Sequence, residues 1–186
     1  MDINENTLDQ CIAHSGNAPG RSVVTRRTRR LRAAIPEMRE PVRVALVPPP
    51  ARAAYVELVR ELKHRYKIAV RKWHRHMGGV SFELTYRDGR IKRLIAAPRP
   101  KSPVSAAIFL HEVGHHAIGF KRYHSRCLEE HYVWQWTFRE MEARKIPITP
   151  GVMRHFRRSM YHYVKRSQRR AEHVPAELGH FGHWPG

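Results

Sequence analysis

Residues 102–119 read SPVSAAIFLHEVGHHAIG and have the end signals and the periodicity of a single helix. Ser102 is a good N-cap, Pro103 suits the first helical position, and Gly119 is a natural C-terminal stop. Spacings of three and four place the following residues on one face: Val104, Ile108, His111, His115 and Ile118. We therefore expect a helix from residue 103 to about residue 118.

Two histidines on this helix have the spacing of metal ligands. Side chains four residues apart project from the same face, so His111 and His115 can direct ring nitrogens at one ion. Glu112 is rotated by about 100° from His111 and can instead reach a water on the open side of the ion. Zinc lowers the pKa of bound water to about 7, so we expect a zinc site with Glu112 as general base. His116 should point off the metal face, at the surface or behind the ligands.

A third protein ligand is required, because a catalytic zinc ion has three protein ligands and a water. Glu130 would share a helical face with the apolar or inward residues Val133, Trp134, Thr137 and Met141. A buried carboxylate needs a partner, which zinc would provide. We favour Glu130, with Glu129 as the alternate ligand. The remaining candidates are His131, His124 and Cys127.

The patterns on either side of this helix predict an α+β protein. Helices are expected at about 51–65, at 128–144 and from Thr149-Pro150 onward, and strands at 42–47, 68–73, 80–86 and 91–97. Asp88-Gly89 is a strong two-residue turn, so the last two strands should form a hairpin that could offer an edge to a substrate. We expect a small antiparallel or mixed sheet packed on the HExxH helix, with further C-terminal helices.

The length of 186 residues suits one folded domain. We expect it at 35–170, preceded by a basic, flexible arm at 1–34 and followed by an irregular tail at 171–186. Two cysteines are too few for a disulfide scaffold, and the first residues lack the features of a signal peptide. No apolar run reaches the roughly 20 residues of a membrane span, so we expect a cytoplasmic protein.

The formal net charge of +19 is concentrated outside the metal motif. Residues 21–32 contain six arginines and residues 151–170 contain seven Lys or Arg, and neither stretch has an acid, whereas residues 102–150 are nearly balanced. Such charge would attract nucleic acid, although a solvated face is the simpler alternative. The Arg-rich arm and the basic 151–170 helix are therefore candidate nucleic-acid contacts.

The motif and the segment after it resemble the ImmA/IrrE metallopeptidases, a gluzincin-like family. In that family an HExxH helix precedes a helix with an E-x-x-A-x-x-F-A type motif, and residues 130–137, EHYVWQWT, have similar spacing although Val133, Trp136 and Thr137 replace the usual residues. The resemblance covers about residues 50–145. It implies a zincin-like fold, zinc bound by His111, His115 and Glu130, and a metallopeptidase that cleaves DNA-associated regulatory proteins.

Two other interpretations stay open. The chain could be a basic nucleic-acid-binding protein in which zinc is structural or absent. It also resembles the SprT-like proteases, which act near DNA, in its charge and its HExxH motif. Those proteases usually have a later His-Gly pair, which cannot be placed among His116, His124 and His131.

Overall fold

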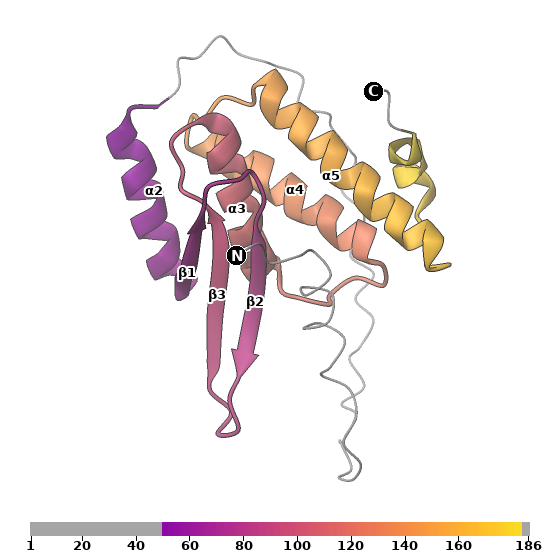
Figure 1. Cartoon of the computed structure of the whole chain (residues 1–186), viewed down its shortest axis with the longest axis horizontal. Coiled ribbons are helices and arrows are strands. Elements are labelled where there is room, and N and C mark those ends of the chain that lie inside the picture. Colours follow the sequence, from indigo (N-terminus) through magenta and orange to yellow (C-terminus); the bar gives the residue numbers. More distant parts are fainter. Residues whose placement is uncertain (1–49, 184–186) are drawn as a thin grey trace. The chain divides into compact units, whose positions relative to one another are not determined.

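The structure, a computed structural model, describes residues 50–183, so the expected arm at 1–34 and strand at 42–47 lie outside the described residues (Figure 1). The described elements are helices α2 (Arg52–Arg65), α3 (Pro103–Ile118), α4 (Arg126–Ala143) and α5 (Pro150–Arg169), strands β1 (Ile68–His74), β2 (Val80–Thr85) and β3 (Ile91–Pro98), and the 3-10 helix η1 (Ala176–Gly182). The predicted α+β class is therefore confirmed. Within residues 50–183, no helix combines the length and the apolar character needed to cross a membrane.

The sheet has three strands in the order β1-β3-β2 and is mixed. Strand β3 pairs parallel with β1 and antiparallel with β2. The predicted hairpin between β2 and β3 is confirmed, and Gly89 at its turn has a φ of 82°, which glycine adopts without steric cost. Strand β2 is thus an edge strand whose outer side pairs with no other described strand.

Helix α3 forms as its end signals predict. The Ser102 hydroxyl accepts a hydrogen bond from the Ser105 N–H at 3.3 Å, and Gly119, with φ of 86°, donates its N–H to the His115 carbonyl at 3.1 Å. The helix packs against β3 and β2, while α2 packs against β1 (Figure 1). Every residue from 105 to 116 is buried, so the HExxH motif lies inside the protein.

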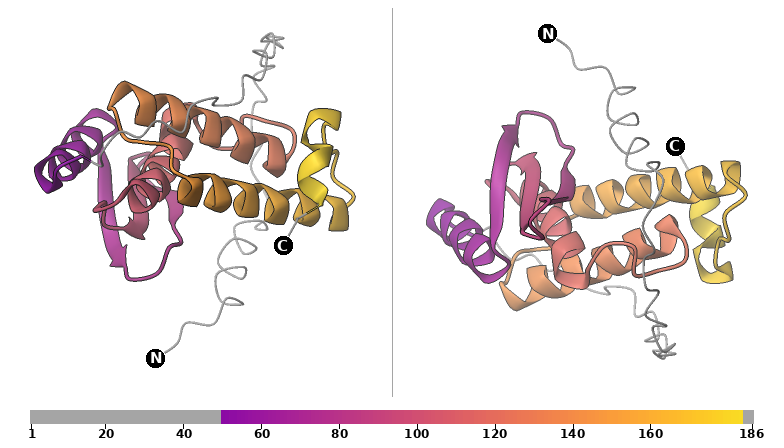
Figure 2. Two further views of the ribbon diagram at one scale, coloured as in Figure 1. Left: turned by 90° about the horizontal axis from the view of Figure 1, so that it is seen from above. Right: turned by 90° about the horizontal axis from the view of Figure 1, so that it is seen from below.

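Helices α4 and α5 run antiparallel and side by side, and both contact α3 (Figure 2). Gly114 allows the close approach of α3 and α4. A Cβ atom at this position would lie 2.9 Å from both Val133 Cγ1 and Trp136 Cε3, well inside ordinary van der Waals distance. The absence of a side chain at residue 114 therefore brings the motif against the first half of α4.

The C-terminal tail differs from the expected irregular segment, because it contains the η1 helix. Leu178 is fully buried against the core, and the Phe181 ring lies 5.4 Å from that of Phe156 on α5. Contact of the buried Leu178 and the partly buried Phe181 with the core orders the segment, although Pro175, Gly179 and Gly182 are typical of a loop.

Candidate metal centre

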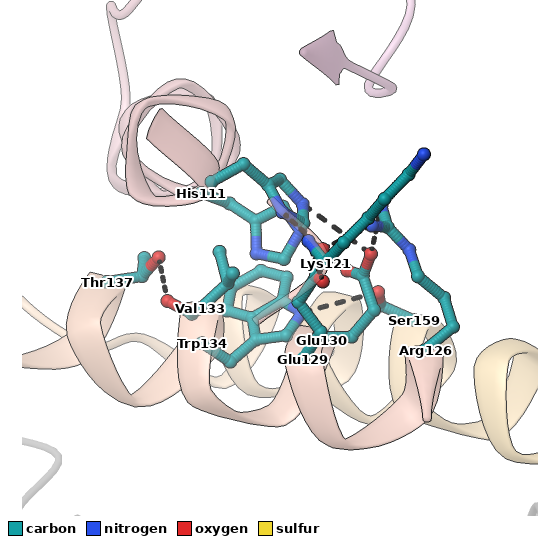
Figure 3. Close-up of polar contacts among 10 residues, drawn as sticks. His111, Lys121, Arg126, Glu129, Glu130, Val133, Trp134, Thr137 and Ser159 are labelled. Atoms are coloured by element: carbon teal, nitrogen blue, oxygen red, sulfur yellow. Dashed lines mark hydrogen bonds and ion pairs between the residues drawn. The ribbon is translucent and has the colours of Figure 1, made fainter. Parts of the chain in front are cut away.

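Helices α3 and α4 bring together His111, His115 and Glu130, each of which offers one ligand atom within 4.8 Å of the other two. Figure 3 shows His111 of α3 facing Glu130 of α4. All three side chains are buried, and Glu130 is completely so. His111 Nε2 lies 3.0 Å from Glu130 Oε2, and His115 Nε2 lies 3.5 Å from Glu130 Oε1. This group could hold a metal ion.

The donor atoms fit a small divalent cation. Tetrahedral zinc with bonds of about 2.0–2.1 Å separates its ligand atoms by about 3.3 Å, and the distances of 3.0 and 3.5 Å lie on either side of this value. Within the described residues, the Nδ1 atoms of His111 and His115 are buried without a hydrogen-bond partner, whereas Glu130 Oε1 is paired with Arg126. Buried ring nitrogens in this state require another partner, such as water.

The surroundings of Glu130 favour its ionised form. Burial alone would raise its pKa, but the two histidines and Arg126 outweigh burial and lower the pKa of Glu130 to about 2. The Arg126 guanidinium forms an ion pair with Glu130 Oε1 at 2.8 Å (Figure 3). Arg126 is one turn before Glu130 on α4, and its role is absent from our sequence analysis although the i,i+4 spacing could have indicated it.

Glu129, the alternate ligand, is engaged elsewhere. Its Oε2 accepts a hydrogen bond from the Lys121 N–H at 2.8 Å, and its Oε1 pairs with Arg126 (Figure 3). The same oxygen lies 3.7 Å from His115 Nδ1, which is the ring nitrogen away from Glu130. Glu129 therefore occupies the position from which a carboxylate orients a histidine ligand from behind.

The other ligand candidates do not join the group. His131 Nε2 lies 2.8 Å from the Gln135 side chain, and the buried Cys127 sulfur lies 3.4 Å from the Ser125 hydroxyl. Within residues 50–183, only His111, His115 and Glu130 form a group that could hold a metal ion, so His124 is also outside it.

Glu112 is buried between α3 and the start of the edge strand β2. A Cβ atom on Gly79, the residue before β2, would lie 2.5 Å from Glu112 Oε1, so glycine leaves the space that this carboxylate fills. Burial raises the pKa of Glu112 above its ordinary value, while the two histidines and a hydrogen bond with Ser81 of β2 oppose the rise. Helix phase predicts the position of Glu112, but no local pattern indicates that Gly79 contacts it, because the two residues are 33 positions apart.

His116 is buried, so the surface position that we allowed for it is wrong. Its Nε2 lies 3.2 Å from the Leu94 carbonyl of β3, and burial lowers the pKa of its imidazole. It thus connects α3 to the sheet on the side away from Glu130. Helix phase correctly directed His116 away from the metal face. Its partner is on strand β3, and helical periodicity contains no information about which strand lies there.

Helix α5 supports the ligand-bearing part of α4. The Trp134 indole, which packs 4.5 Å from the His111 ring, donates its N–H to the Ser159 hydroxyl at 3.3 Å (Figure 3). The His155 ring lies 5.8 Å from that of Trp134, and the Tyr163 ring lies 5.8 Å from the Arg126 guanidinium carbon. The four-residue spacing of these α5 residues indicates one helical face, which sequence analysis overlooked among the neighbouring arginines.

Comparisons of the chain with models of protein families, with curated proteins and with solved structures found no match. The resemblance to the ImmA/IrrE metallopeptidases therefore stays a prediction. The interpretation of the metal centre depends on its own donor atoms, their burial and their distances.

Proposed function

We propose that the protein is a zinc-dependent metallopeptidase with His111, His115 and Glu130 as zinc ligands and Glu112 as general base. The observation that carries the proposal is the convergence of three buried donor atoms next to the buried carboxylate of Glu112, which is not one of them. When bound, zinc would supply a Lewis acid that polarises a peptide carbonyl and acidifies a water molecule. Glu112 would accept the proton of that water and deliver it to the leaving amine.

The donor set favours a catalytic ion over a structural one. Structural zinc sites are closed by four protein ligands, most of them cysteines, whereas catalytic sites use three and leave one position for water or substrate. Within residues 50–183 the group has two histidines and one carboxylate, and the described cysteine, Cys127, lies outside it.

A peptide substrate fits the edge strand. An extended peptide can add to the free side of β2 through backbone hydrogen bonds, which gives affinity without a defined sequence. Glu112 lies against Gly79 and Ser81 at the start of that strand. A chain bound along β2 would therefore pass close to the proposed general base. A DNA-associated regulatory protein is our proposed substrate class, because the chain is strongly basic.

The test begins with the metal. The purified chain should bind one zinc ion, and Glu130→Gln should weaken binding by about 10- to 100-fold or more, because even outer-shell changes have that effect. Glu129→Gln is the matched control on the same helix turn and should retain more affinity than Glu130→Gln. A larger loss of zinc in Glu129→Gln would exchange the roles of the two carboxylates.

Activity is tested separately with a fluorescently labelled unfolded protein as substrate. Glu112→Gln should keep its zinc and lose hydrolysis, because the amide cannot accept the proton. Full hydrolysis by this variant would refute the proposed mechanism. If the wild-type chain binds zinc but cleaves neither this substrate nor DNA-binding repressor proteins, the alternative is favoured: a basic nucleic-acid-binding protein with structural zinc.

A further inference from the structure

Helix α5 has an outward side that is rich in cations and lies roughly opposite the side that it buries. Its buried residues are Val152, Phe156, Met160, Val164 and Ser167. Its outward side contains what we call the basic face, which consists of Arg154, Arg157, Arg158, Lys165 and Arg169. The four arginines are exposed, and the Lys165 ammonium lies 6.0 Å from the centre of the Tyr161 ring. At 100° per residue the five cations fall within an arc of about 120°.

Within residues 50–183, the basic face has no carboxylate partner, and it lies in a part of the sequence without acids. Five other arginines in this range pair with acids, whereas further exposed arginines, such as Arg52 and Arg87, are also unpaired: the pairs are Arg60 with Glu57, Arg90 with Asp88, Arg93 with Glu83, Arg126 with Glu129 and Glu130, and Arg144 with Glu140 and Glu61. No ion pair found within that range involves a cation of the basic face. Residues 143–171 contain no Asp or Glu at all. A helix face that is merely solvated usually mixes both signs of charge, so this one fits an anionic partner.

We propose that the basic face binds the phosphate backbone of double-stranded DNA. The face runs from residue 154 to residue 169, a length of about 22 Å at 1.5 Å per residue. A DNA duplex of that length carries about 13 charges at one per 1.7 Å. Four of the five cations are arginines, whose planar guanidinium groups donate two parallel hydrogen bonds to a phosphate.

The shape of the surface favours DNA over two other polyanions. The major groove of B-DNA, about 12 Å wide, admits an α-helix, whereas the deep and narrow major groove of double-stranded RNA does not. A membrane-surface helix needs an apolar side for insertion, but the apolar side of α5 is already buried in the core. DNA is therefore the occupant that matches both the charge and the helix.

The basic face and the metal centre can be occupied at the same time. Ser159, which accepts the hydrogen bond of Trp134 beside His111, lies about 80–160° around α5 from the five cations of the basic face. DNA on the basic face would thus contact the side of α5 that is turned away from α4. The inference does not depend on the proposed function, and the same chain could hold DNA while it cleaves a bound protein.

Fluorescence anisotropy with a labelled 24-base-pair duplex tests the proposal in the full-length chain. The test variant changes all five cations of the basic face to glutamine. The matched control changes five exposed cations elsewhere, also to glutamine, and so has the same net charge: Arg52, Lys63, Arg75, Arg87 and Lys92. Surface changes of this kind shift stability by about 0.5 kcal/mol or less each, and thermal unfolding of both variants checks that they fold.

The salt dependence of binding gives the sharpest result. Each phosphate contact adds about −0.9 to the slope of log Kobs against log salt concentration. The slope of the test variant should therefore be less steep than that of the wild type by about 4.5, and the slope of the control should change far less. A triple variant of Arg154, Arg157 and Arg158 should lose about 2.7. Equal losses in the test variant and the control would overturn the proposal, because net charge alone would then explain binding. Equal affinity of the wild-type chain for double-stranded RNA and for DNA would also overturn the proposal. So would a test variant that still binds DNA as the wild type does but no longer binds phosphatidylserine vesicles.

Discussion

Replacement of Gly114 by alanine tests the contact that forms the metal centre. The new Cβ atom would lie 2.9 Å from Val133 Cγ1 and Trp136 Cε3, whereas carbon atoms pack at about 3.5–4.0 Å, so α3 and α4 must separate by about 0.6 Å or more. Overpacking of this kind costs about 1–3 kcal/mol. Alanine in a helix recovers about 1 kcal/mol relative to glycine, which leaves a net loss of about 0–2 kcal/mol.

The separation should also weaken zinc binding, because Glu130 is on α4 and both histidines are on α3. Metal–ligand distances tolerate only about 0.2 Å of error. Thermal unfolding of the metal-free protein should show a lower Tm, by about 2–4 °C per kcal/mol for a chain of this size. Competition with a chromophoric chelator measures the zinc affinity of the same samples.

Gly179→Ala is the matched control, since a Cβ atom at that position would meet nothing within 4 Å. It should leave both the Tm and the zinc affinity nearly unchanged. Helix propensity by itself predicts that Gly114→Ala raises the Tm, whereas overpacking of α3 against α4 lowers it. The sign of the change in Tm therefore shows which of the two effects is larger. A raised Tm with unchanged zinc affinity would refute the close contact of α3 and α4.

Three further changes test other parts of the structure. Gly79→Ala should displace the Glu112 carboxylate and reduce peptide hydrolysis at least tenfold while zinc stays bound, as zinc analysis and a fluorescent protein substrate would reveal; unchanged activity would contradict the contact. Ser102→Ala removes the acceptor for the Ser105 N–H and should cost about 1 kcal/mol in urea unfolding, and no loss would refute the cap. Burial, helped by His111, lowers the pKa of His155 to about 4, so the unfolded chain binds a proton that the folded chain does not. Stability of the metal-free protein should therefore fall as the pH drops from about 6.5 to 4, by roughly 1–2 kcal/mol after allowance for partial exposure. His155→Gln should reduce the pH dependence of stability. Identical pH profiles of the variant and the wild type would contradict the assignment of that dependence to His155.

Local chemistry made much of the fold predictable. Ser102, Pro103 and Gly119 define the ends of α3, and Asp88-Gly89 defines the hairpin turn, because capping and turn geometry depend on a few adjacent residues. Helix phase also placed Glu130 on the buried side of α4. These features depend on interactions within about one turn, so a single sequence contains the information needed.

Contacts between distant segments could not be predicted in the same way. The parallel pairing of β1 with β3 joins strands that are separated by the whole of β2, and nothing in either strand specifies its neighbour. The contact of Gly79 with Glu112 and the hydrogen bond of Trp134 with Ser159 likewise connect elements whose relative position only the packed core determines. Helical periodicity identifies the side that is buried but not the residue that it meets.

The candidate metal centre differs from the rest of the core in how its charge is balanced. An ionised Glu130 with no counter-charge would cost several kcal/mol in the protein interior. Arg126 supplies that charge at 2.8 Å, and its side chain remains 41% exposed, so part of its hydration is retained. The ion pair can therefore stabilise the buried carboxylate in the metal-free chain, while the second carboxylate oxygen still faces His111. A ligand that is already ionised and already oriented needs neither deprotonation nor rearrangement when a metal arrives, and this lowers the free-energy cost of binding.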